Sequence, residues 1–413
     1  MKSIHLQKMR LLIIATLFLA IMLGGCINGH NPTGNNWSNV RPISFTTPMD
    51  IVAGYSFPGS GSLKGTETSL VCGNYNDLES VAFMRFTGLP SVGTFHIPEA
   101  YQDSTYLNLV LTRKFSESRN PVEIMIYKLN QSWAADSTNL ILDSNLTLIT
   151  PQSYTIIDSI SSSGTQIKIP IPIEALEQWT SDADTLGLTL AIKTGEDSYI
   201  EIKSLESGSG PKLRFLYRTN EEEQTEKKYE QYCTQDSYRI DEATAPILTN
   251  QWILSNIPSS RIFLYFPLDY SLFQDTEGNL LNEIQLKRMT INHAELIFYV
   301  KENPYYDTST QYSIRADRLN DSLDINTAIA ISDDQVASGI TTQSYIRGDS
   351  LTVNITPLIQ AYTSGDKENY GIVIRSMQEL KNYGKIELWH FNDNSTPPEK
   401  QPKLRITYTP PFL

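Results

Sequence analysis

The chain has 413 residues and a formal net charge of −13, with 46 acidic against 33 basic side chains. An acidic chain without a Lys/Arg-rich tract lacks the electrostatic footprint of a nucleic-acid-binding protein, and it lacks a basic face for anionic lipid. Its length suggests two or three domains.

Residues 1–25 have the parts of a secretory signal peptide: three basic residues, an apolar run over 11–23, and small residues before a Cys. The ending Leu23-Gly24-Gly25-Cys26 resembles the lipobox of bacterial lipoproteins, in which the peptide is cut before the Cys and the Cys is acylated. The resemblance implies a stable lipid anchor on Cys26, because several acyl chains bind a membrane far better than one. Cleavage removes three positive charges and no acids, which changes the net charge from −13 to −16.

The segment after the expected cleavage site indicates to which membrane the lipoprotein is sorted and how far its folded part can extend from that membrane. Ile27 stands where the inner-membrane retention signal of Gram-negative bacteria has Asp, so the resemblance implies an outer-membrane lipoprotein, periplasmic or surface-exposed. Residues 26–39 are mostly Asn, Gly, Ser and Pro, which cannot bury enough apolar surface to fold. We expect a flexible tether.

Residues 40–218 show short alternating strands separated by Gly, Pro, Asn and Ser, the pattern of an antiparallel sandwich domain. A short helix is expected at 174–179, before the last strands. The expected strands are 50–55, 69–72, 80–86, 106–111, 122–127, 166–171, 186–193, 199–203 and 211–217.

Residues 219–232 have mixed charge and no periodicity, which predicts a solvated linker. The second domain, 233–413, repeats the pattern of the first. Thr356-Pro357 should start a helix over 358–362 that Ser364-Gly365-Asp366 closes. The expected strands are 261–266, 291–300, 313–319, 351–355, 370–375, 385–389 and 402–408.

The two domains end in nearly the same string, Pro-Lys-Leu-Arg-Phe-Leu-Tyr at 211–217 and Pro-Lys-Leu-Arg-Ile-Thr-Tyr at 402–408. The strands 82–86 and 124–129 also have counterparts at 261–266 and 313–319. The sequence therefore predicts two copies of one all-β domain in tandem.

The second copy resembles the DNRLRE-type β-sandwich domains of bacterial surface proteins. The resemblance is carried by Ala-Glu-Leu at 294–296, Asn-Ile-Thr-Pro-Leu-Ile-Gln-Ala-Tyr at 354–362, Asn-Tyr-Gly-Ile-Val-Ile-Arg at 369–375 and the closing strand. The first copy has Gly-Leu-Thr-Leu at 187–190 for Gly-Ile-Val-Ile. The resemblance implies two jelly-roll-like sandwiches related to carbohydrate-binding modules.

Two cysteines remain in the mature chain, Cys72 and Cys233. In an exported protein they could pair, and a bridge would then staple the two domains, because Cys233 stands where the second copy begins. The alternative is two separate buried thiols. Neither has a second Cys or a His at zinc-ligand spacing, so no zinc site is expected.

Signals for catalysis and for cofactors are thin. The chain has no His-Glu-x-x-His motif, nucleophile elbow or phosphate-binding Gly loop, and we expect no enzymatic activity. Carboxylates cluster at Asp317, Asp321, Asp324 and 333–334, but without the spacing of a Ca²⁺ loop, so solvated loop charge is the favoured interpretation.

Aromatic residues near amides and carboxylates are the best functional signal, because sugars stack on flat rings while polar groups bind their hydroxyls. The candidates for glycan binding are Tyr305, Tyr306, Tyr383, Trp389, Asn392 and Asp393. For Trp389 the alternation of the strand favours a place in the core over exposure. We expect a non-catalytic module for extracellular or cell-surface glycans. The alternative is an adhesin-type protein–protein scaffold in the outer membrane.

Overall fold

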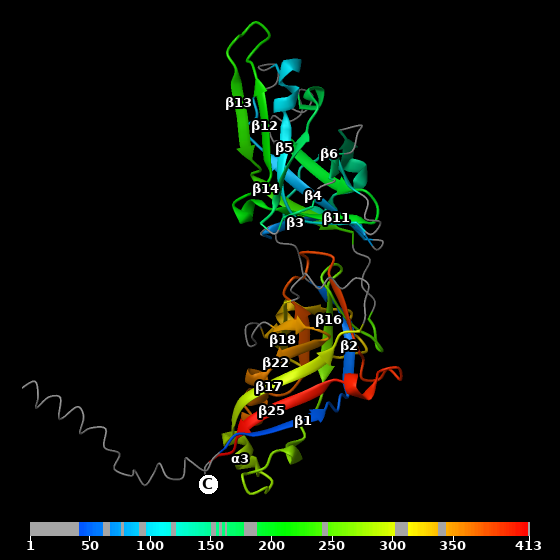
Figure 1. Cartoon of the computed structure of the whole chain (residues 1–413), viewed down its shortest axis with the longest axis vertical. Coiled ribbons are helices and arrows are strands. Elements are labelled where there is room, and N and C mark those ends of the chain that lie inside the picture. The colour runs from blue at the N-terminus through cyan, green and yellow to red at the C-terminus, as the bar shows by residue number, and fades with distance from the viewer. Residues whose placement is uncertain are drawn as a thin grey trace, which may run out of the picture.

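The computed structural model of the chain describes residues 41–411 apart from 61–66, 76–77, 91–95, 117–120, 150–153, 157–158, 162, 177–187, 242–246, 302–312 and 338–343. The described part forms two all-β lobes stacked along the long axis (Figure 1). Its strands belong to two pairing networks, of 12 and of 13 strands. The expected signal peptide, Cys26 and the expected tether lie outside the described residues.

The first lobe contains the 12-stranded network. Its strands are β3 (Ser69–Tyr75), β4 (Leu78–Phe86), β5 (Tyr106–Ser116), β6 (Val122–Leu129), β7 (Leu146–Leu148), β8 (Tyr154–Ile156), β9 (Thr165–Pro170), β10 (Leu188–Thr194), β11 (Ser198–Lys203), β12 (Lys212–Tyr217), β13 (Lys227–Tyr232) and β14 (Gln235–Ile240). One layer has the order β13-β12-β5-β9 and the other β14-β4-β10-β6, and β3 and β11 join them. Apolar side chains of both layers meet in one core.

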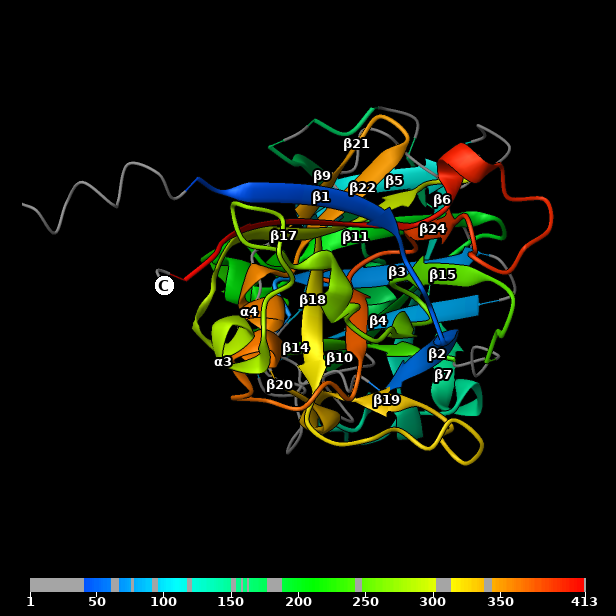
Figure 2. The same ribbon diagram turned by 90° about the horizontal axis from the view of Figure 1, so that it is seen from below.

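The second lobe contains the 13-stranded network. Its strands are β1 (Ile43–Pro48), β2 (Ala53–Ser60), β15 (Trp252–Ser255), β16 (Ser260–Tyr265), β17 (Thr290–Tyr299), β18 (Ser313–Leu319), β19 (Ile331–Ser332), β20 (Val336–Ala337), β21 (Ser344–Arg347), β22 (Ser350–Asn354), β23 (Ile372–Ser376), β24 (Lys385–Leu388) and β25 (Lys403–Thr409). One layer runs β1-β25-β17-β22 and the other β2-β16-β23-β18. Figure 2, seen along the long axis, shows β1 and β25 side by side.

Helices are few and short. The helices with complete bounds are α3 (Glu283–Arg288), α4 (Thr356–Ser364) and the 3₁₀ turns η2 (Glu99–Ser104), η3 (Thr138–Leu140), η4 (Asp143–Asn145), η5 (Leu205–Ser207), η6 (Tyr270–Leu272), η7 (Asp333–Gln335) and η8 (Pro398–Lys400). Residues 173–176 are also helical, where the sequence predicts a helix over 174–179, and residues 177–179 lie outside the described residues. The predicted helix after Thr356-Pro357 is confirmed as α4. It ends at Gly365, whose φ of 78° is a left-handed conformation that glycine adopts without steric cost.

The same pairing scheme occurs in both lobes. In β12, Lys212 to Tyr217 pair with Tyr232 to Lys227 of β13, and in β25 the matching residues Lys403 to Tyr408 pair with Pro48 to Ile43 of β1. Leu319 at the end of β18 matches Leu129 at the end of β6, as the sequence repeat predicts. Pairing with the neighbouring strands places Leu190 opposite Met84 and Ile372 opposite Leu264, so the first-copy match to 371–374 lies at 189–192, two residues from the expected 187–190.

The lobes are not consecutive segments, which differs from the expected boundaries of 40–218 and 233–413. β1 and β2 pair within the second lobe, and β13 and β14 pair within the first (Figure 1). The expected linker over 219–232 is half strand, because Lys227–Tyr232 forms β13. This edge strand was not predicted, because its side chains are mostly charged or polar, alternate little and leave only Tyr229 buried.

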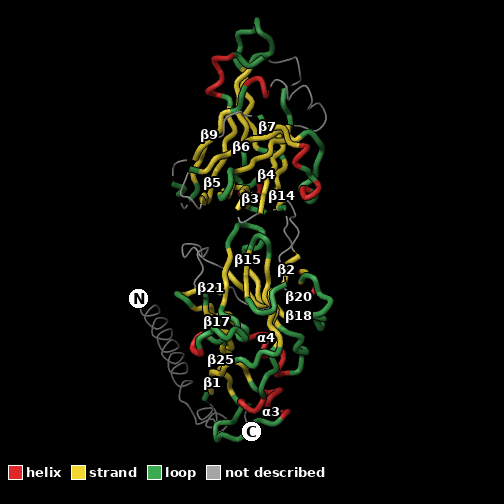
Figure 3. The backbone as a smooth tube through the Cα atoms, turned by 90° about the vertical axis from the view of Figure 1, so that its right-hand side faces the viewer, coloured by secondary structure: helices red, strands yellow, loops and turns green. Residues whose placement is uncertain are grey.

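The two lobes meet through Tyr383, a residue of the second lobe whose side chain is 5% exposed. Its ring lies 4.9 Å from that of Tyr199 and 5.9 Å from that of Tyr75 in the first lobe. Its hydroxyl lies 2.8 Å from Ser80 Oγ and donates to the Gly73 carbonyl over 3.3 Å. Figure 3 shows β15, from the second lobe, facing the first lobe beside this joint. Tyr383 therefore belongs to the core of the joint and is not the exposed turn residue expected for a glycan platform.

The carboxyl of Glu201 in the first lobe is largely buried. Glu201 of β11 has 12% of its side chain exposed, and Arg113 Nε lies 3.5 Å from its Oε1. Burial raises the pKa of Glu201 to about 7, although the positive charge of Arg113 opposes the shift.

Candidate functional site

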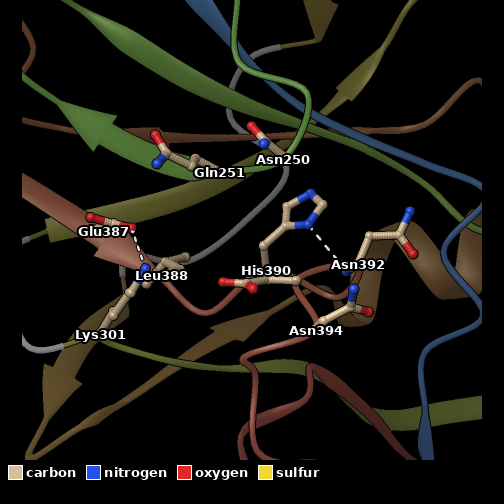
Figure 4. A pocket seen from close by; sticks show the side chains of 9 residues that line it. Asn250, Gln251, Lys301, Glu387, Leu388, His390, Asn392 and Asn394 are labelled. Carbon is tan, nitrogen blue, oxygen red and sulfur yellow. Dashed lines mark hydrogen bonds and ion pairs between the residues drawn. The ribbon is translucent and has the colours of Figure 1, made fainter.

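A polar pocket of about 290 Å³ opens on the second lobe (Figure 4). It is formed by the segment before β15, Lys301 two residues after the end of β17, the end of β24 and the loop after it. Its lining residues are Asn250, Gln251, Lys301, Glu387, Leu388, His390, Asn392, Asp393 and Asn394. Four of the nine are amides, which both donate and accept hydrogen bonds.

The loop after β24 is held in place by hydrogen bonds that begin at His390. Its side chain is 2% exposed, and its Nδ1 accepts from the backbone N–H of Asn392 over 3.1 Å. Its Nε2 therefore carries the proton and donates to the Gly54 carbonyl over 3.3 Å. Burial lowers the pKa of His390, which keeps the ring neutral. Thr396 Oγ1 donates to the His390 carbonyl over 2.7 Å and fixes the far end of the loop.

The Asp393 carboxylate bonds to the backbone of its own loop, while its neighbours Asn392 and Asn394 line the pocket. Its Oδ1 accepts from the backbone N–H of Ser395 over 2.8 Å, and this bond lowers the pKa of the Asp393 carboxyl. Asn392 and Asn394 on either side are exposed. The loop thus presents two amide side chains to solvent from a backbone that is fixed at both ends.

An ion pair and an aromatic ring lie along one side of the pocket. Lys301 Nζ lies 3.0 Å from Glu387 Oε1 and 5.4 Å from the centre of the Trp389 ring. Trp389 is half-buried, while its neighbours Leu388 and His390 are 1% and 2% exposed. Alternation along β24 therefore holds with the opposite phase to the expected one, since Trp389 lies on the outer face and not in the core. Phe391 packs inside, where it stacks on Trp252 at 5.6 Å.

The sequence-predicted site residues separate into three groups. Asn392 and Asp393 line the pocket; Trp389 does not line it, but its ring lies 5.4 Å from Nζ of the lining residue Lys301; and Tyr383 is buried in the joint between the lobes. Tyr305 and Tyr306 lie outside the described residues.

The pocket also has lining residues that the sequence did not indicate. They are Asn250, Gln251, Lys301, Glu387, Leu388 and His390. Glu387, Leu388 and His390 flank the predicted Trp389 in the sequence, whereas Asn250, Gln251 and Lys301 come from distant parts of the chain and carry no local signal. Asn394, the next residue after the candidates Asn392 and Asp393, also lines the pocket.

The two cysteines do not staple the lobes. Both thiols are free and buried, and both belong to the first lobe because β13 and β14 do. The Cys72 thiol donates to the Ile192 carbonyl over 2.9 Å, and Cys233 Sγ lies 3.5 Å from Asp236 Oδ2. Burial raises the pKa of each thiol.

The carboxylates considered for Ca²⁺ have structural partners. Asp317 is fully buried between Arg315 and Arg375, at 2.8 and 2.7 Å, which corrects the expectation of solvated loop charge at this position. Asp333 binds Arg375 at 2.6 Å, and exposed Asp324 caps a turn. Among the described residues, no group of three or more His, Cys, Asp or Glu could hold a metal ion.

Comparison with known proteins finds no family model and no curated protein that matches this chain. The resemblance to DNRLRE-type domains therefore rests on the quoted residues. Within the part of the chain that the structure describes, no helix has the length and apolar character needed to span a membrane.

Proposed function

We propose that the protein is a lipid-anchored envelope lipoprotein that binds a glycan, without catalysis, in the polar pocket of the second lobe. The observation that carries the proposal is the lining of this pocket. Amides from two separate segments line a volume of about 290 Å³, and the half-buried ring of Trp389 lies 5.4 Å from Nζ of the lining residue Lys301. Sugars need such a combination, because their hydroxyls pair with amides and carboxylates while their C–H faces stack on rings.

The charge of the lining supports a neutral ligand. Lys301 is matched by Glu387 at 3.0 Å, so its ammonium is not left to attract an anion. Asp393 adds one carboxylate whose Oδ1 is already used by the loop. Hydrogen bonds through side-chain amides therefore supply most of the recognition.

The position of the first described strand supports the proposed anchor. β1, the first described strand, lies with β25 and α3 at the end of the molecule away from the first lobe (Figure 1). A lipid on Cys26 would hold the second lobe nearer the membrane and the first lobe farther from it. Cys26→Ser is expected to release the protein from the membrane fraction and to abolish labelling with radioactive palmitate. Membrane retention of unlabelled Cys26→Ser protein would contradict the anchor.

A glycan array with the mature protein tests the binding function. We expect saturable binding whose affinity falls about 5- to 150-fold in Asn392→Ala/Asn394→Ala, because two lost hydrogen bonds are worth about 1–3 kcal/mol. The matched control is Asn326→Ala, an exposed amide on another loop of the same lobe.

A separate variant, Tyr305→Ala/Tyr306→Ala, tests the tyrosines that follow Lys301 in the sequence. Loss of binding in this variant would add these rings to the site. Silence across the array, with co-purification of an envelope protein, would overturn glycan binding in favour of the scaffold role.

A further inference from the structure

Each lobe is completed by a two-stranded segment. The N-terminal arm is β1 and β2, residues 43–60, and the middle arm is β13 and β14, residues 227–240. In both lobes the first strand of the arm pairs with the last strand of the lobe, and the second strand pairs with β4 or β16.

The arms cross over with respect to the sequence repeat. The N-terminal arm precedes β3 of the first lobe but completes the second, and the middle arm precedes β15 of the second lobe but completes the first (Figure 1). Because the registers are the same, each arm has the backbone pairing needed to fit either lobe. Side chains must therefore decide which arm goes where.

The first deciding feature is charge. In the first lobe Val81 of β4 faces Arg239 of the middle arm, and at the matching position of the second lobe Arg261 of β16 faces Phe57 of the N-terminal arm. Each lobe thus has one guanidinium at this pair, supplied by the arm in one case and by the lobe in the other. Both are buried, at 4% and 0% exposed.

The two guanidinium groups have matching partners. Arg239 donates to the Ile141 carbonyl and lies 2.7 Å from Asp143. Arg261 donates to the Ile331 carbonyl over 2.9 Å and lies 2.7 Å from Asp333.

The second deciding feature is volume. On the outer face of each β4- or β16-containing layer lies a small apolar cluster, and the buried members of each include one large ring besides the Phe of β4 or β16. In the first lobe this ring is Trp133, which lies 5.8 Å from Phe83, and in the second it is Phe57, which lies 6.4 Å from Phe263. The first comes from the lobe itself and the second from the arm.

If each arm bound the other lobe, both the buried charges and the side-chain volumes would be mismatched. The second lobe would set Arg239 against Arg261, two like charges in directly opposed positions, and would lose the ring of Phe57 from its cluster. The first lobe would have no guanidinium for Asp143, and Phe57 would be added to a cluster that Trp133 already fills.

We propose that each lobe carries a binding site for a two-stranded arm of this chain, and that the pairs Val81–Arg239 and Phe57–Arg261 select which arm binds. The arms are thereby exchanged between the two repeats within one molecule, and the second lobe is complete only when the N-terminal arm is bound. The exchange interlocks the lobes in addition to the joint at Tyr383.

Cysteine pairs in the full mature chain test the assignment. Ser44 faces Thr407 and Lys228 faces Leu216, so Ser44→Cys/Thr407→Cys and Lys228→Cys/Leu216→Cys should cross-link within one chain under mild oxidation. Ser44→Cys/Leu216→Cys and Lys228→Cys/Thr407→Cys should give only background. Bonds in the second two variants, or bonds of the first two that join separate chains on a non-reducing gel, would overturn the assignment.

Exchange of the two residues of one pair tests the selection. Arg239→Val should raise the unfolding equilibrium constant at least about tenfold, because hydrogen bonds to a charged group are lost. Val81→Arg/Arg239→Val copies the arrangement of the second lobe and should restore stability to near the starting value. Val81→Arg alone places two arginines opposite each other, at positions 81 and 239, and this variant should be less stable than the parent. A double variant no more stable than Arg239→Val would overturn the selection rule. If Arg239→Val does not fold, the yield of the Lys228→Cys/Leu216→Cys link in the double variant decides the question.

Discussion

Replacement of Tyr383 tests how firmly the lobes are joined. The ring is 5% exposed and is packed against Tyr75 and Tyr199, so Tyr383→Ala removes a buried aromatic side chain. Such truncations cost about 3–5 kcal/mol of unfolding free energy. The hydroxyl adds about 0.5–1.5 kcal/mol through Ser80 and the Gly73 carbonyl.

Urea unfolding separates these contributions. Tyr383→Phe keeps the ring and should lower the unfolding free energy by about 1 kcal/mol, whereas Tyr383→Ala should lower it by about 3.5–6.5 kcal/mol. Because the ring links the cores of the two lobes, Tyr383→Ala should also split the unfolding curve into two transitions. A Tyr383→Ala protein that unfolds at the same urea concentration as the parent would refute the role of the joint.

Three further predictions concern single groups. The pKa of Glu201, about 7 when folded, lies above its ordinary value, so the folded state holds the proton more tightly. The protonated Glu201 side chain therefore contributes fully to the unfolding free energy below about pH 4.5. This contribution falls by on the order of 3 kcal/mol as the pH rises to about 7. Glu201→Gln should flatten this part of the stability–pH curve, and an unchanged slope would contradict the buried carboxyl. Gly371→Ala should destabilise by more than about 2 kcal/mol in urea, because φ is 111° and a Cβ would lie 2.5 Å from a buried ring of β16. Gly278→Ala, with positive φ but open space, should cost only the backbone strain of about 1–2 kcal/mol, and equal losses would show that the clash is absent. Cys72 and Cys233 should react with a thiol reagent only after the protein is unfolded. If no thiol reacts even in denaturant, the two cysteines form a disulfide.

Local patterns predicted most of the strands and one helix. Alternation located β17, β18 and β25, and Thr356-Pro357 with Gly365 bounded α4. These features depend on neighbouring residues, so the sequence contains their full signal.

Long-range pairing was not visible in the same way. The repeat suggested consecutive domains, but nothing local in β1 or β13 shows which last strand it pairs with, since their registers are the same. The residues that distinguish the two arms are Arg239 and Phe57. Their effect depends on the residues they face in the neighbouring strand, Val81 and Arg261.

The candidate site was predicted in part. Asn392, Asp393 and Trp389 were indicated because a ring precedes polar turn residues, and they do lie together. Asn250 and Gln251 approach from a segment about 140 positions earlier, and pairing of β15 with β24 brings them there.

The central claim is that the pocket beside Trp389 binds a glycan. The most direct measurement follows the tryptophan fluorescence of the mature protein during titration with the strongest array ligand. We expect a saturable change whose apparent Kd rises about 5- to 150-fold in Asn392→Ala/Asn394→Ala and stays unchanged in Asn326→Ala. Equal affinity in all three proteins would contradict the assignment of this pocket.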